Sequence, residues 1–117
     1  MRILFDHGTP DGLVRALLTH SVTFAREKQW ERLSNGALLT AGEQAGFELM
    51  LTTDSKIRYQ QNLVGRRIAL VVVTGSTDWA RIKLCLAEIS AAVDAAQAGS
   101  YTEVFVPFAP RPSSGRS

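Results

Sequence analysis

The chain has 117 residues, of which 45% are hydrophobic and 21% charged, and its formal net charge is +2. This composition is typical of one soluble domain with a real hydrophobic core, and it excludes a collagen-like or strongly charged disordered chain. Two of the 13 basic residues, Arg111 and Arg116, lie in the tail, which leaves 11 against 11 acidic residues before it. Overall charge therefore gives no argument for nucleic-acid binding, and such an argument must be local.

Cys85 is the single cysteine, so a disulfide framework and a cysteine metal site are excluded. It falls within an apolar helical pattern, which favours a buried, unreactive thiol. The start of the chain lacks the pattern of a signal peptide. The longest apolar run, 68–73, is too short to cross a bilayer. We expect a cytoplasmic protein without membrane contact.

The first expected strand is a short apolar run, Ile3 to Phe5, which ends at Asp6. Thr9 is a candidate N-cap for a helix with Pro10 at its first position. The buried stripe of this helix is expected at Leu13, Val14, Leu17 and Leu18. A short second strand is expected near 21–24.

The next expected helix has Ser34 as its N-cap and Gly46 after its end. Beyond it, the patterns predict a strand over 47–53 that ends at Asp54, a short helix or turn over 56–62, a strand over 68–73, a long amphipathic helix over 79–96 and a last, edge strand over 101–106. The Pro-, Ser-, Gly- and Arg-rich residues 107–117 are expected to form a disordered tail after a single domain of residues 1–106.

Strands that alternate with helices indicate an α/β fold with a mainly parallel sheet of four to five strands. We expect the strand order 2-1-3-4, with the fifth strand beside the fourth. The first and third strands are then neighbours at the point where the chain direction across the sheet reverses, which is where ligands bind in such folds. Asp6 and Asp54 would lie side by side there.

Asp6 and Asp54 are therefore the candidate ligands of one divalent cation, which would serve phosphate chemistry. A third acid could come from Glu43 or Asp78. Structural roles compete in each case. Asp6 could cap a turn, Asp54 could cap the segment after it, Glu43 could be a solvated helix residue, and Asp78 could stabilise a helix N-terminus. His7 could bind metal or substrate.

Basic and polar residues follow Asp54 closely and could hold phosphates and stack on an unpaired base: Lys56, Arg58, Tyr59 and Gln60. A solvated helix face with ordinary charges is the alternative interpretation.

Four segments resemble the small PIN-like proteins related to VapC toxins: Leu4 to Pro10, Trp30 with Leu33 to Leu39, Gly46 to Asp54, and Arg58 to Leu63. The resemblance covers 1–106. It implies a three-layer α/β/α PIN-like fold and a Mg²⁺- or Mn²⁺-dependent endoribonuclease of toxin–antitoxin type, with RNA as substrate and an antitoxin as possible partner. In such a protein Asp6 and Asp54 would be metal ligands and, with Glu43, would form the catalytic set.

The chain also departs from those relatives, which often carry acids where Asn35, Gly36 and Ala37 stand and just after the third strand. These departures favour an alternative function, a catalytically impaired PIN-like domain that binds a protein or nucleic acid. A response-regulator-like domain shares the fold class, but it needs a lysine that the segment Val73 to Gly75 does not supply. The last strand's edge and Trp79 could support a homodimer, although Trp79 fits the core equally well.

Overall fold

The computed structural model describes residues 1–57 and 63–108 of the chain. Five strands form one sheet in the order β2-β1-β3-β4-β5, and every neighbouring pair is parallel. The strands are β1 (Arg2–Phe5), β2 (Ser21–Phe24), β3 (Leu49–Thr52), β4 (Ala69–Gly75) and β5 (Tyr101–Val106). The expected strand order and the edge position of the last strand are both confirmed.

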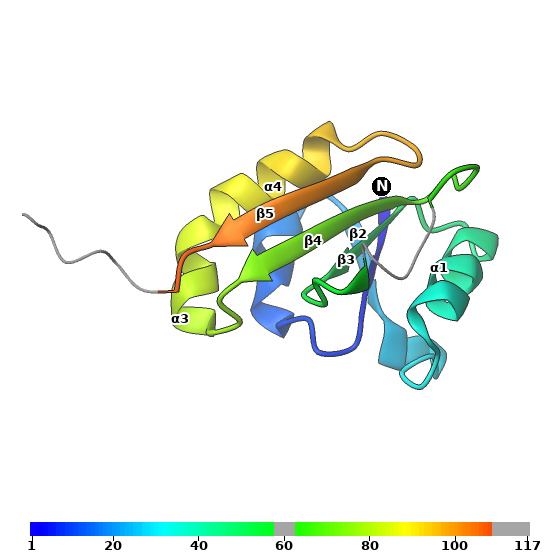
Figure 1. Cartoon of the computed structure of the whole chain (residues 1–117), viewed down its shortest axis with the longest axis horizontal. Helices are drawn as coiled ribbons and strands as arrows, with labels where there is room; N and C mark the ends of the chain where they lie inside the picture. Colours follow the sequence, from blue (N-terminus) through cyan, green and yellow to red (C-terminus); the bar gives the residue numbers. More distant parts are fainter. Residues whose placement is uncertain (58–62, 109–117) are drawn as a thin grey trace, which may run out of the picture.

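Helical segments cover both faces of this sheet, so the described part of the chain forms three layers (Figure 1). They are η1 (Asp11–Leu17), η2 (Ala25–Lys28), α1 (Asn35–Gln44), α3 (Trp79–Ile82), η3 (Lys83–Cys85) and α4 (Leu86–Ala95). The segments η1, α3, η3 and α4 pack on one face, and α1 packs on the other. The α/β class is confirmed.

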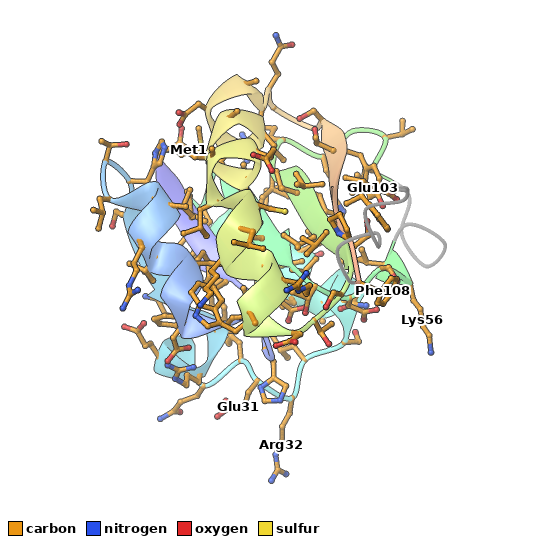
Figure 2. The ribbon with its side chains drawn as sticks, turned by 90° about the vertical axis from the view of Figure 1, so that its left-hand side faces the viewer. Met1, Glu31, Arg32, Lys56, Glu103 and Phe108 are labelled. Carbon is orange, nitrogen blue, oxygen red and sulfur yellow. The ribbon has the colours of Figure 1, made fainter. Side chains whose placement is uncertain are left out.

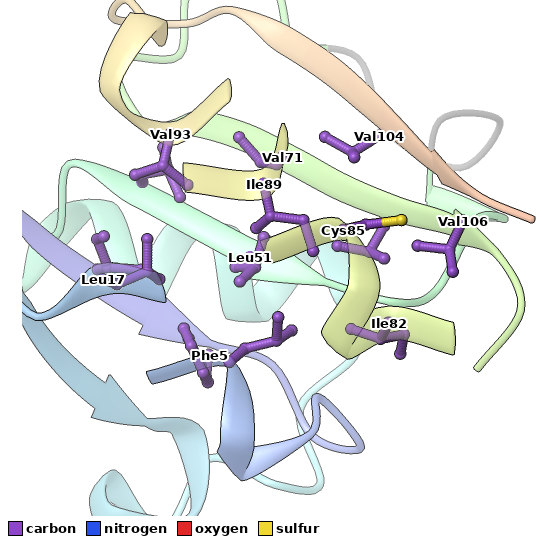
Figure 3. Packing of buried hydrophobic residues seen from close by; sticks show 14 of the residues in the cluster. Phe5, Leu17, Leu51, Val71, Ile82, Cys85, Ile89, Val93, Val104 and Val106 are labelled. Atoms are coloured by element: carbon purple, nitrogen blue, oxygen red, sulfur yellow. The ribbon is translucent and has the colours of Figure 1, made fainter. Parts of the chain in front are cut away.

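Alternate strand residues divide the core into two clusters, because successive side chains of a strand point to opposite faces. Ile3 and Phe5 of β1 pack toward η1 and α4, whereas Leu4 packs toward α1. Figure 3 shows the larger cluster, in which the helical residues Ile82, Cys85, Ile89 and Val93 lie over the strands. Cys85 is buried as expected, and burial raises the pKa of its thiol.

The start of α1 follows local sequence chemistry. The Ser34 Oγ atom accepts a hydrogen bond from the Ala37 N–H, so Ser34 is the N-cap that the sequence predicts. Gly46 follows the helix with φ = 89°, a backbone conformation that glycine adopts at little cost. The chain then enters β3.

Three expectations about the first helical segment were wrong. Residues Asp11–Leu17 form a 3₁₀ helix whose N-cap is Pro10, so Pro10 is not its first residue and Thr9 is not its N-cap. The Thr9 side chain is buried, and its hydroxyl donates to the Leu51 carbonyl at 3.3 Å. Leu18 follows the last residue of η1 and is 78% exposed, so it is no part of the buried stripe.

The expected helix over 79–96 is interrupted. A 3₁₀ turn at Lys83–Cys85 separates α3 from α4, although both helices pack on the same cluster. Trp79 is half-buried against this cluster, which favours its core role over a dimer contact. The expectations for 58–62 and for the tail from 109 fall outside the described residues. Among the described helices, none has the length and apolar character needed to span a bilayer.

Candidate functional site

The end of β1 and the end of β3 meet at the carboxyl edge of the sheet, where the strand order reverses between β1 and β3. Asp6 directly follows β1, and its backbone N–H still pairs with the Leu51 carbonyl at 3.0 Å. Asp54 lies two residues beyond the end of β3. The structure thus places both candidate carboxylates at the position where ligands bind in open parallel sheets.

Thr52 connects the two acidic residues. Its hydroxyl donates a hydrogen bond to Asp6 Oδ2 at 2.7 Å and accepts one from the Asp54 N–H at 3.0 Å. Thr52 is fully buried, so its hydroxyl has no solvent alternative for these bonds. The other oxygen of Asp6, Oδ1, accepts from the His7 N–H at 2.7 Å. The Asp6 carboxylate is therefore held in one orientation by two donors.

Asp54 is also held by two donors, one on each oxygen. The Asn35 side-chain amide donates to Asp54 Oδ2 at 3.1 Å, and the Lys56 N–H donates to Asp54 Oδ1 at 3.0 Å. Asn35 is the first residue of α1, so this helix begins at the carboxyl edge beside Asp54. The bond from Lys56 is the local cap that competes with a metal role for Asp54.

The electrostatic environment of Asp6 and Asp54 favours a cation beside them. Burial raises the pKa of the Asp6 carboxyl, and the nearby Asp54 charge adds to this rise. The hydrogen bonds from Thr52 and from the His7 N–H oppose it, as does the charge of His7, but the net pKa stays above the ordinary value. A half-buried carboxylate next to a second one is stabilised when a cation neutralises both.

Glu43 does not join this pair. Helix α1 starts at the carboxyl edge with Asn35, and Glu43 lies eight residues further on, which is roughly 12 Å along a helix axis. Its carboxylate accepts from the backbone N–H groups of Arg67 and Ile68, just before β4. Those bonds, the one from Arg67 first, lower the pKa of Glu43 despite its partial desolvation. Glu43 therefore has a structural role at the opposite edge of the sheet.

Of the remaining candidates, Asp78 has a structural role, whereas His7 and Lys56 are exposed near the two aspartates. The Asp78 side chain accepts from the Ala80 N–H and caps α3, as one interpretation of the sequence predicted. His7 is exposed beside Asp6, and Lys56 is exposed beyond Asp54. Arg58, Tyr59 and Gln60 lie outside the described residues.

Asn35 was missed as a site residue, because the sequence marked it only as a position where relatives carry an acid. The sequence did contain a signal for Asn35: it directly follows the N-cap Ser34 and is therefore the first residue of the helix. A helix that follows a strand end and packs back along the sheet must begin at the carboxyl edge, and so its first residues lie near the strand-end acids.

Two carboxylates with an amide and a hydroxyl beside them are oxygen groups of the kind that Mg²⁺ or Mn²⁺ prefers. Magnesium is often held by one or two carboxylates together with substrate phosphate. Within residues 1–57 and 63–108, no three His, Cys, Asp or Glu side chains gather in a way that could hold a metal ion.

Comparisons of the chain with models of protein families, with curated proteins and with solved structures found no match.

Proposed function

We propose that this protein is a PIN-like, Mg²⁺- or Mn²⁺-dependent endoribonuclease, of the toxin type of a toxin–antitoxin system. The supporting observation is the Asp6–Thr52–Asp54 arrangement at the carboxyl edge of the sheet, in which a buried hydroxyl donates to the Asp6 carboxylate and accepts from the Asp54 backbone N–H. The substrate would be RNA, and a cognate antitoxin would be the protein partner.

In this proposal Asp6 and Asp54 hold the cation. A divalent cation there would lower the pKa of water and stabilise negative charge on a phosphodiester oxygen. Thr52 holds one oxygen of Asp6 and Asn35 holds one oxygen of Asp54, so both carboxylates are fixed in place before a cation arrives. The exposed Lys56 ammonium would attract a phosphate of the RNA.

A second function is favoured by the contacts of Asp54. Both of its oxygens already accept hydrogen bonds, from Asn35 and from the Lys56 N–H. If these bonds persist in solution, the pair binds cations weakly and the protein is a catalytically impaired PIN-like module. Such a module would bind nucleic acid or another protein without cleaving RNA.

Titration calorimetry with Mn²⁺ separates the two functions. The nuclease requires Mn²⁺ binding that Asp54→Asn and Asp6→Asn both abolish, and Mg²⁺- or Mn²⁺-dependent cleavage of single-stranded RNA that disappears with it. Glu43→Gln is the matched control, because its carboxylate lies at the other edge and its loss should leave Mn²⁺ binding unchanged.

Cleavage that survives both aspartate substitutions would refute the proposed site. The absence of any Mn²⁺ binding by the natural protein would support the binding module instead.

A further inference from the structure

We propose that a cavity at the amino edge of the sheet, where the strands begin, binds a free α-amino acid with an apolar side chain. The cavity has a volume of about 410 Å³, which lies within the range of roughly 300–1,000 Å³ for small-molecule sites. Its lining comes from residues at or just before the starts of β1, β3 and β4, from the end of α1 and from the residues that follow α4. Segments that are distant in the chain thus meet around one hollow.

This cavity is separate from the Asp6–Asp54 pair and does not depend on the proposed nuclease function. Met1 lines the cavity, and β1 connects Met1 to Asp6 through roughly 16 Å of extended chain. Figure 1 shows the N-terminus, the start of β4 and the loop between α4 and β5 at the same end of the sheet. In Figure 2, Met1 lies on the opposite side of the molecule from Lys56, which follows Asp54 closely.

The lining offers one positive and one negative group that the protein itself does not use. The Arg67 guanidinium makes no hydrogen bond or ion pair with the described residues, since only the backbone N–H of Arg67 donates to Glu43. Glu48 accepts from the Arg2 N–H at 2.9 Å through Oε1, and its Oε2 atom has no donor within residues 1–57 and 63–108. Arg67 and Glu48 are both exposed, so a ligand can reach them.

Glu43 also lines the cavity, but its charge is already matched within the chain. Its Oε2 atom accepts from the N–H groups of Arg67 and Ile68, and its Oε1 atom lies 3.9 Å from Arg66 Nη1. The charges left for a ligand are therefore those of Arg67 and Glu48. A ligand with a single charge would leave one of them unpaired and would be repelled by it, whereas a zwitterion matches both.

The apolar part of the lining selects the rest of the ligand. Phe47 belongs to the buried cluster beneath α1, whereas Ala69 belongs to the cluster beneath α4 and Ala96 packs against it. The cavity thus opens between the two helical layers, and its apolar surface favours an aliphatic or aromatic group. The short side chains of Ala69, Ala96 and Ala98 leave the space for that group.

A free α-amino acid has all three features in one small molecule. Its carboxylate can form a bidentate pair with the Arg67 guanidinium. Its ammonium group can donate to Glu48 Oε2. Helix α4 ends at Ala95, and the residues after it line the cavity, so the partial negative charge of this helix C-terminus also favours an ammonium group.

NMR titrations of the ¹⁵N-labelled chain with L-leucine and with L-phenylalanine test this site. We expect the backbone N–H signals of Glu48, Ala69 and Ala98 to shift, because these residues line the cavity. The N–H signals of Asp6 and Asp54 should stay in place, because both residues lie at the carboxyl edge. Ligand concentrations up to about 10 mM detect even a site with a millimolar Kd.

Two analogues of leucine test whether both charges are needed. Isocaproate lacks the ammonium group, and isopentylamine lacks the carboxylate. Each should bind at least about tenfold more weakly than leucine, because each leaves one charged side chain of the cavity without a partner.

Arg67→Gln and Glu48→Gln test the two side chains directly, and each should raise the Kd for leucine by about tenfold or more. Both substitutions preserve the internal contacts, because Glu43 binds the backbone N–H of residue 67, and an amide oxygen at position 48 can still accept from Arg2. The same spectra report whether each variant is folded.

Arg32→Gln and Glu31→Gln are the matched controls. Both residues are exposed, and Figure 2 shows them at the end of the molecule opposite Met1. Neither substitution should change the Kd for leucine.

Several results would overturn the amino-acid site. They are the absence of shifts with both amino acids, shifts confined to residues away from the cavity, isocaproate or isopentylamine binding as tightly as leucine, or equal losses of affinity in the control variants. None of these results affects the Mn²⁺ titration, which tests the carboxyl edge alone.

Discussion

The Thr52 hydroxyl lies 2.7 Å from Asp6 Oδ2 and so joins the ends of two strands that are 46 residues apart in the chain. The same hydroxyl accepts from the Asp54 N–H, which fixes the direction of both bonds. One buried side chain thereby connects the carboxylate of Asp6 to the backbone of Asp54.

Thr52→Val tests this link, because valine keeps the shape of threonine and removes the hydroxyl. We expect a loss of about 1–3 kcal/mol in the free energy of unfolding, since the Asp54 N–H and the Asp6 carboxylate both lose a partner. Mn²⁺ affinity should fall as well. Thr52→Ser keeps the hydroxyl and should retain most of the Mn²⁺ affinity. Equal Mn²⁺ affinity in the valine variant and the natural protein would remove Thr52 from the site.

The raised pKa of Asp6 predicts a pH dependence of stability. Above that pKa the native carboxylate is charged, and its burial costs stability. As pH falls through the raised pKa, the native state takes up a proton before the unfolded chain does, and the cost is gone below the ordinary aspartate pKa of about 3.9. The Tm of Asp6→Asn minus the Tm of the natural protein should therefore be largest near pH 7. This difference should shrink toward pH 3.5. A difference in Tm that stays constant over this range would contradict the prediction.

Glu43 should show the opposite trend. Its pKa is lowered, chiefly by the bond from the Arg67 N–H, so its charged form stabilises the native state above the unfolded pKa. That stability is lost as pH falls through the lowered pKa. Glu43→Gln should reduce Tm at pH 7, and the reduction should shrink as the solution becomes acidic. A reduction that grows toward low pH would show that other groups control this edge of the sheet.

Gly12 lies against the ring of Trp79. This contact predicts that adding one methyl group at Gly12 strongly lowers the stability of the fold. A Cβ atom at this position would lie 2.5 Å from the Trp79 Cη2 and Cζ2 atoms. Gly12→Ala should thus cost about 1–3 kcal/mol of unfolding free energy, measured by urea denaturation. In a Trp79→Leu background the same substitution should cost much less, because the ring is gone. An equal cost in both backgrounds would mean that the strain arises elsewhere.

Much of this fold was predictable from local chemistry. Apolar runs of strand length, separated by helical periodicity, predicted the α/β class and a parallel sheet, because parallel strands need helical crossovers. Ser34 was predictable as a cap, and Asp78 as an acid that stabilises a helix N-terminus, since both effects depend on residues within one helical turn. Asp6 and Asp54 were predictable as neighbours, because each lies within two residues of the end of a strand and these two strands are adjacent in the sheet.

Other features required the tertiary structure. Thr9 has the chemistry of an N-cap, but packing buries it against β3 and its hydroxyl donates to Leu51 instead. Glu43 and Asn35 lie on the same helix, and their distances to the acidic pair depend on which end of α1 reaches the carboxyl edge. The sequence by itself determined which residues end strands and start helices, because those signals are local. Only the packed sheet decided which of these ends meet, because contacts between distant segments depend on how all the layers fit together.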